Sequence, residues 1–199
     1  MTVVQAPGSP PRPSLPYTRK QVISLLLMMV GAGLLGYVGS QYWYMYHSQR
    51  LLEAEWERQG AAANSPGGPA APALTRISIP KISLEAIVVE GASSQQLTEG
   101  PGHLTETAFP GDSGNAVITG HRDTFFRRIF ELEQGDEISV ERDGRLFRYQ
   151  VTGKKIVKPD DVSVLNPTSD AQLTLITCYP MHYIGPAPKR LVIFSKLSP

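Results

Sequence analysis

Hydrophobic residues along this 199-residue chain form one long apolar block followed by many short runs. The block Val22–Gly39 is strongly apolar, and no charged side chain occurs between Val22 and Tyr46. About 18–25 such residues are enough to cross a bilayer as one helix. A buried core helix and a cleaved signal peptide are alternatives, but a signal peptide has a shorter apolar region and a small-residue cleavage site. The pattern therefore predicts a membrane-spanning signal-anchor at residues 21–46.

Charged and aromatic residues flank this block unevenly. Arg12, Arg19 and Lys20 lie before or at its start, where the first 20 residues are rich in proline and contain no acidic residue. The aromatic residues at its far end are Tyr37, Tyr42, Trp43, Tyr44 and Tyr46. By the positive-inside rule this asymmetry keeps the N-terminus in the cytoplasm. We therefore expect a disordered cytoplasmic tail at residues 1–20 and a single-pass protein of the cell membrane, with the rest of the chain extracytoplasmic.

A stalk and a linker are expected at residues 47–73. Arg50 to Gln59 is charged and predicts that the helix continues out of the membrane. Gly60–Ala73 is rich in Gly, Ala and Pro, which is typical of a flexible or extended linker. The remaining residues, 74–199, amount to about 125, a common domain size.

Short β-branched and apolar runs dominate residues 74–199. These runs are Ile77–Ile79, Ile87–Val89, Asn115–Gly120, Glu137–Val140, Arg145–Val151, Leu173–Thr177 and Leu191–Phe194. Asp143-Gly144 is a strong hairpin-turn signal between two of them. The apolar spacing in Asp123–Leu132 predicts one short amphipathic helix. Many short strands and few helices predict a mainly β domain, either a small barrel or a sandwich.

Composition excludes some partners without naming a function. With 41% hydrophobic residues the chain can bury one core. Its formal net charge of +1 gives no reason to expect a nucleic-acid partner. No His, Cys, Asp and Glu cluster with ligand spacing is visible, so neither a metal nor another cofactor is expected.

The only cysteine, Cys178, ends the apolar run Leu173–Thr177 and is followed by Tyr179-Pro180. A buried strand emerges into a loop at such a position. A lone thiol cannot form an internal disulfide, so Cys178 is either an inert core residue or a reactive one. A nucleophilic cysteine also needs a proton carrier and a group that stabilises the oxyanion of the tetrahedral intermediate.

Two further residues could complete such a site. His121 follows the strand pattern Asn115–Gly120, and a histidine can carry a proton in both directions near neutral pH. Arg190 begins the strand after the Cys178 loop, and a planar guanidinium can hold a carbonyl oxygen. Positive groups near a thiol also favour its thiolate form. Each residue alone has an ordinary structural interpretation. Asp112 and Asp123 are weaker candidates that could orient His121, but a turn position and a helix cap explain them better, and His103 is a weak functional candidate.

The joint pattern resembles the sortase family of membrane-anchored cysteine transpeptidases. The matching residues are Thr-Gly-His-Arg at 119–122, Thr-Leu-Ile-Thr-Cys at 174–178, and Arg190 on the next strand. The resemblance covers residues 74–197, and the upstream anchor fits it. Tyr-Pro directly after the cysteine and Gly-Pro-Ala-Pro-Lys-Arg at 185–190 look most like class D, with class E as the nearest alternative.

The resemblance implies a closed eight-stranded sortase-type β-barrel with one or two short helices. It implies that Cys178 attacks the Thr carbonyl of an LPxT-type sorting signal on a secreted protein, while His121 transfers the proton and Arg190 stabilises the oxyanion. An amine from a cell-wall precursor or a partner protein would then resolve the thioester. The residues expected to contribute to the substrate pocket are Thr177, Tyr179, Pro180 and His182.

Two other functions fit the same residues. In an exported cysteine peptidase, water would resolve the thioester in place of an amine. In a non-enzymatic membrane-anchored β-domain, Cys178 would be structural and unreactive toward a small alkylating reagent.

Overall fold

The computed structural model describes residues 18–63 and 74–198. Helix α1 (Arg19–Ala63) contains the apolar block and continues through the charged segment that follows it. Among the described residues it is the one helix long and apolar enough to cross a membrane, by length and composition. The expected N-terminal tail and the Gly/Ala/Pro linker lie mostly outside the described residues, apart from their helical ends at 19–20 and 60–63.

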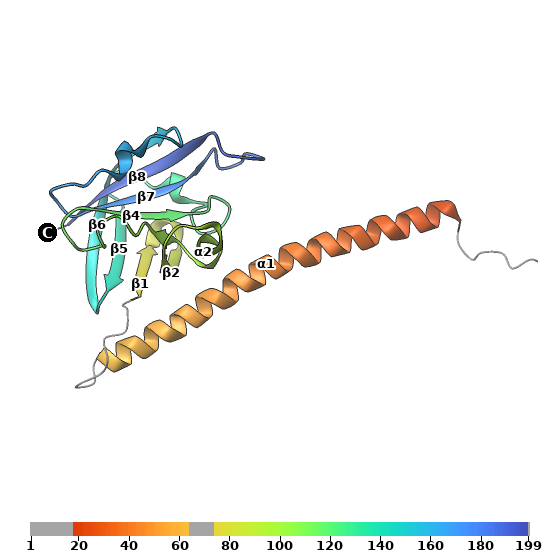
Figure 1. Cartoon of the computed structure of the whole chain (residues 1–199), viewed down its shortest axis with the longest axis horizontal. Coiled ribbons are helices and arrows are strands. Elements are labelled where there is room, and N and C mark those ends of the chain that lie inside the picture. The colour runs from red at the N-terminus through yellow and green to blue at the C-terminus, as the bar shows by residue number, and fades with distance from the viewer. Residues whose placement is uncertain (1–17, 64–73, 199) are drawn as a thin grey trace, which may run out of the picture. The chain divides into compact units, whose positions relative to one another are not determined.

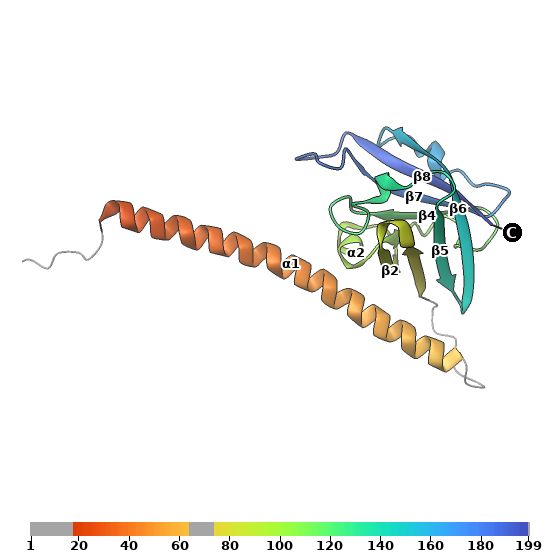
Figure 2. The same cartoon turned by 180° about the vertical axis from the view of Figure 1, so that it is seen from behind.

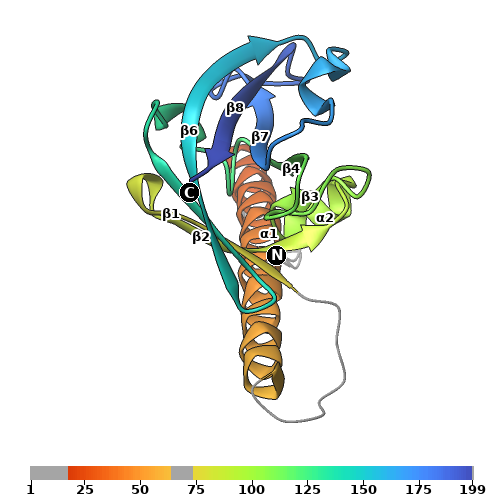
Figure 3. The same ribbon diagram turned by 90° about the vertical axis from the view of Figure 1, so that its left-hand side faces the viewer.

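Eight strands close into a barrel (Figures 1 and 2). They are β1 (Thr75–Ile79), β2 (Leu84–Glu90), β3 (Gly102–His103), β4 (Asn115–Gly120), β5 (Glu137–Arg142), β6 (Arg145–Val157), β7 (Gln172–Tyr179) and β8 (Lys189–Leu197). Their order around the barrel is β1-β2-β3-β4-β7-β8-β6-β5, and Figure 3 shows β6, β8, β7 and β4 following one another along one wall. Strand pairs β2–β3 and β4–β7 are parallel, whereas the other pairs are antiparallel. The expected mainly β fold, a closed eight-stranded barrel, is confirmed.

The core fills the barrel because its strands alternate apolar and polar positions. In β6, Phe147, Tyr149 and Val151 are buried while Arg148 and Gln150 between them are exposed. Successive side chains of a strand point to opposite faces, so this alternation fixes which face turns inward. Burying one such large apolar side chain contributes about 1.5–3 kcal/mol.

The sequence patterns did not predict several short elements, among them one helix and one strand. Helix α2 (Ser94–Glu99) begins with a capping box between Ser93 and Gln96, which satisfies amides that the first helical turn leaves free. Strand β3 has two residues, too few for any period to show in the sequence.

The amphipathic helix predicted at Asp123–Leu132 is wrong. The segment forms consecutive turns that end in the 3₁₀ helix η2 (Ile129–Glu131). Its fully buried residues Phe126, Ile129 and Leu132 are three apart, and the Ile129 and Leu132 amides donate to carbonyls three residues earlier. A spacing of three fits i→i+3 hydrogen bonding, because a 3₁₀ turn has three residues.

Candidate active site

Cys178 and Arg190 occupy paired strand positions at one end of the sheet, and His121 directly follows the last residue of the neighbouring strand. In the parallel pair β4–β7, Gly120 lies opposite Thr177, so His121 and Cys178 are the residues that directly follow this pair. In the antiparallel pair β7–β8, Cys178 lies directly opposite Arg190. The three residues therefore stand at one level across β4, β7 and β8, although 57 residues separate His121 from Cys178 in the chain.

Cys178 faces away from the main core. Leu173 and Leu175 belong to the large core cluster inside the barrel, whereas Ile176 packs in a second cluster with Val192. Because side chains alternate along a strand, Cys178 shares the face of Ile176, and Arg190 shares the face of Val192. The 3₁₀ helix η3 (Val162–Leu165) covers this second cluster through Val164. Both Cys178 and Arg190 are partly buried, so the thiol stands at the edge of an apolar patch and keeps access to solvent.

The ends of β4 and β7 are tied by a buried hydrogen bond. The Thr177 hydroxyl donates to the Gly120 carbonyl at 2.7 Å, and Thr177 is 1% exposed. A side chain at Gly120 would place its Cβ 2.8 Å from the Phe126 ring, so the position requires glycine. These contacts fix the spacing of the chain segments that carry His121 and Cys178.

Arg190 is anchored on one side of its guanidinium. Its Nη1 donates to the carbonyl oxygens of Ala187 and Lys189, at 3.2 and 3.0 Å. Within the described part of the chain its Nε and Nη2 groups make no hydrogen bond. The guanidinium therefore retains donors that a substrate oxygen could use.

A cavity of about 600 Å³ brings three of the expected substrate-pocket residues together. It is lined by Phe130, Lys154, Lys155, Ile156, Tyr179, Pro180, Met181, His182 and Leu191. Tyr179 and Leu191 also contact the main core, so the cavity lies on the barrel-interior side of β7 and β8. Cys178 points to the other face, and the fourth expected residue, Thr177, does not line the cavity. The Cys178 thiol and this cavity therefore lie on opposite faces of β7.

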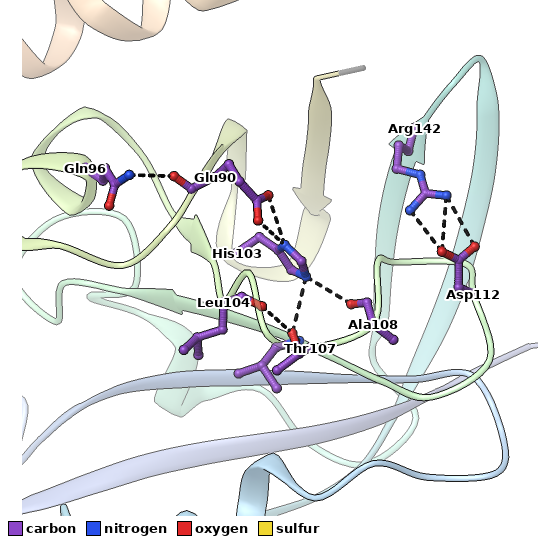
Figure 4. Close-up of polar contacts among 9 residues, drawn as sticks. Glu90, Gln96, His103, Leu104, Thr107, Ala108, Asp112 and Arg142 are labelled. Atoms are coloured by element: carbon purple, nitrogen blue, oxygen red, sulfur yellow. Dashed lines mark hydrogen bonds and ion pairs between the residues drawn. The ribbon is translucent and has the colours of Figure 1, made fainter. Parts of the chain in front are cut away.

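His103 is a buried residue of β3 whose polar partners come from β2 and from the loop after β3 (Figure 4). Its Nδ1 lies 3.0 Å from a carboxylate oxygen of Glu90, and its Nε2 lies 2.9 Å from the Ala108 carbonyl and 3.2 Å from the Thr107 hydroxyl. The ring is 3% exposed and stacks on Phe109. Both ring nitrogens are engaged, so His103 pins the loop that precedes β4.

Neither weaker acidic candidate contacts His121 among the described residues. Asp112 pairs with Arg142, with 3.2 Å between Oδ1 and Nη2 (Figure 4). Asp123 lies 3.5 Å from Nε of Arg122. Arg122 belongs to the Thr-Gly-His-Arg motif at 119–122. Its position directly after His121 is the only indication of a functional role that the sequence offers for it.

The arrangement offers a thiol, an imidazole and a guanidinium at one end of a rigid sheet. These are the groups that acyl transfer through a cysteine thioester requires. The ends of well-packed strands hold such groups in place better than mobile loops do.

Comparison with known proteins agrees on one family. A family model of the sortase domain matches residues 77–198. Sortase D of Bacillus subtilis is 41% identical over 121 residues, covering 60% of this chain and 61% of that protein. Sortase SrtE1 of Streptomyces coelicolor is 28% identical over 198 residues, covering 85% of this chain and 55% of that protein. The chain therefore spans less than two thirds of the length of these curated relatives.

Solved structures show the same similarity. A Sortase D5 transpeptidase of Clostridium perfringens has a TM-score of 0.63 at 25% identity, covering 78% of this chain and 99% of that chain. Sortase C-1 from Actinomyces oris has a TM-score of 0.58 at 34% identity, covering 63% of this chain and 73% of that chain.

Proposed function

The chain belongs to the sortase family, and from that premise we propose that it is a cysteine transpeptidase that attaches secreted proteins to an amine acceptor at the cell surface. Its substrates carry an LPxT-type sorting signal, which it cleaves after the threonine. The observation that carries the proposal is the alignment of His121, Cys178 and Arg190 at one level of three adjacent strands.

In the first half of the proposed reaction, the Cys178 thiolate attacks the threonine carbonyl of the signal. The oxygen gains negative charge, and the free N–H groups of Arg190 stabilise it. When the tetrahedral intermediate collapses, the peptide bond breaks and protonated His121 gives its proton to the departing amine. The product is a thioester between Sγ of Cys178 and the threonine carbonyl carbon.

In the second half an acceptor amine attacks the thioester carbonyl. Neutral His121 removes a proton from that amine, and the Cys178 thiolate leaves as the new amide forms. The acceptor is an amine of a cell-wall precursor or of a partner protein. The Cys178 thiolate and protonated His121 are restored for the next turnover.

The proposed location is the cell membrane. Helix α1 would be the anchor, and the basic residues at its start support a cytoplasmic N-terminus by the positive-inside rule. The barrel would then meet its substrates outside the cytoplasm.

Class D is the proposed subclass. The Tyr179-Pro180 pair after the nucleophile and the 41% identity to Sortase D of Bacillus subtilis support it. Class E is the alternative, given the longer but weaker match to Sortase SrtE1.

Product analysis tests the function. The full chain in detergent micelles would be incubated with LPxTA and LPxTG peptides and an added amine, with Cys178→Ala as control, and products followed by mass spectrometry. The expected product is a peptide–amine conjugate that Cys178→Ala does not form. Cleavage without any conjugate would instead indicate a cysteine peptidase. A thiol inert to alkylation together with uncleaved peptides would support a structural role for Cys178.

A further inference from the structure

The loop between β7 and β8, residues 180–188, begins two residues after Cys178 and contains neither helix nor strand. Its tip is exposed: Ile184 is fully exposed and Tyr183 is 45% exposed. A segment of this length loses considerable conformational entropy when it adopts one conformation. Contacts from outside the loop are therefore needed to hold it.

One arginine supplies those contacts. Nη1 of Arg122 donates to the Pro180 carbonyl at 3.0 Å, and Nη2 donates to the carbonyls of Tyr183 at 2.7 Å and Gly185 at 3.1 Å. The guanidinium carbon also lies 6.0 Å from the centre of the Tyr183 ring. A single guanidinium thus binds the start of the loop at Pro180 and both sides of its tip at Tyr183 and Gly185.

The environment of Arg122 favours this use of its charge. Its side chain is only 10% exposed, although the Tyr183 and Gly185 carbonyls that it binds lie in an exposed part of the loop. Its acidic neighbour, Asp123, is 72% exposed and lies 3.5 Å from Nε, away from the two Nη groups. Charged donors make stronger hydrogen bonds than neutral ones, and a planar fork can reach several acceptors that a single ammonium cannot.

Arg122 also connects the loop to His121, its direct neighbour in the chain. The His121 carbonyl accepts a hydrogen bond from the Phe126 amide at 3.1 Å. This bond fixes the backbone around His121 and Arg122. The loop that follows Cys178 is therefore tied to the chain segment that carries His121.

We propose that Arg122 is a positioning residue that holds loop 180–188 as a preformed wall of the substrate site. This rests on the proposed function, because it assigns the loop to binding of the sorting signal. Arg122 does not touch reacting atoms. It lowers KM because the loop is already ordered, so substrate binding does not have to offset the loss of the loop's conformational entropy.

The first test measures the loop without any substrate. Full chain in detergent micelles would be treated with chymotrypsin, and cleavage after Tyr183 followed by mass spectrometry. Arg122→Gln should raise that cleavage rate about tenfold, because proteolysis tracks local opening. Arg122→Lys should give an intermediate rate. The matched control is Arg127→Gln, five residues along the same segment, where the exposed arginine side chain makes no hydrogen bond or ion pair with the described residues.

The second test separates positioning from general stability. With the sorting peptide, Arg122→Gln should raise KM about tenfold while kcat changes less than about threefold, the pattern of lost binding. Alkylation of Cys178 by iodoacetamide should keep its wild-type rate. A merely structural role would lower kcat through a smaller folded fraction and leave KM unchanged.

Two results would overturn the proposal: equal chymotrypsin cleavage after Tyr183 in wild type and Arg122→Gln, or an unchanged KM. If the wild type processes no peptide, the proposed function fails, and the cleavage assay alone decides whether Arg122 holds the loop.

Discussion

Arg190 uses its guanidinium in two ways. Nη1 donates to the carbonyls of Ala187 and Lys189, whereas Nε and Nη2 make no hydrogen bond with the described residues and could bind a substrate. That division requires a guanidinium. A lysine at this position has a single side-chain nitrogen. That nitrogen cannot bind the loop carbonyls and an oxyanion in the planar geometry of a guanidinium.

Arg190→Lys should therefore lower kcat by about 10²–10³-fold, the usual cost of removing one oxyanion donor. The measurement is steady-state transpeptidation by the full chain, with Lys189→Arg as control at the exposed neighbouring position. Wild-type turnover by Arg190→Lys would remove Arg190 from the oxyanion role.

Thr177 carries a second prediction at the residue scale. Thr177→Val keeps the shape but leaves the buried Gly120 carbonyl without its donor, which costs about 1–3 kcal/mol. The midpoint of thermal unfolding of the barrel, followed by near-UV circular dichroism, should fall by several degrees. Thr177→Ser keeps the hydroxyl and should recover most of that loss; equal loss in both variants would show that the hydrogen bond is not the cause.

The sequence alone singled out the candidate catalytic residues but not their contacts. Cys178, His121 and Arg190 each stand beside a recognisable strand pattern, so they could be singled out. The loop contacts of Arg122 could not be predicted, because its carbonyl partners lie 58 to 63 positions away and carbonyl oxygens leave no mark in a sequence.

At the scale of elements, apolar period and length decided what could be predicted. The run Asn115–Gly120 coincides with β4 because all but one of its residues are buried. Strand β6 extends to Val157, past its predicted end, where pairing with β8 continues despite exposed lysines. The prediction for Asp123–Leu132 was wrong because the fully buried residues fall at every third position, a spacing that the adjacent apolar residues Phe125 and Phe130 obscured.

An ion pair links the start of the barrel to β5 and makes stability depend on pH. Lys81 in the 3₁₀ helix η1 (Pro80–Ile82) lies 2.8 Å from Oδ2 of Asp136, which also accepts the Glu133 amide at 2.6 Å. Burial alone would raise the pKa of Asp136, but these hydrogen bonds lower the pKa below its ordinary value of 3.8. A lowered folded-state pKa stabilises the protein at neutral pH, and that stabilisation disappears as pH falls below about 4.

Asp136→Asn should therefore reduce the loss of thermal stability between pH 5 and pH 3. The control is Asp160→Asn, an exposed position whose side chain has no partner among the described residues, and it should keep the wild-type slope. The same slope in wild type and Asp136→Asn would contradict the assignment of this acid sensitivity to the Lys81–Asp136 pair.

At the scale of the whole molecule, the order of the strands in the closed barrel brings the candidate site residues together. Strand β7 pairs with β4 on one side and β8 on the other, so one strand from the middle of the chain and two from its C-terminal part meet at one end of the sheet. The number of strands came from family resemblance, since short apolar runs alone fit a sandwich as well as a barrel. Register between strands so distant in the chain depends on the complete core, which no local pattern encodes.

The proposed reaction depends on a thioester between Cys178 and the threonine of a sorting signal, formed with the help of the residues aligned with Cys178. The most direct measurement is intact-protein mass spectrometry and peptide mapping of the full chain after reaction with a sorting peptide in the absence of amine. We expect an adduct whose mass ends at the threonine, located on Cys178, released by an added amine and absent from Cys178→Ala. Cleavage of the peptide with no adduct on Cys178, or with equal cleavage by Cys178→Ala, would contradict the claim.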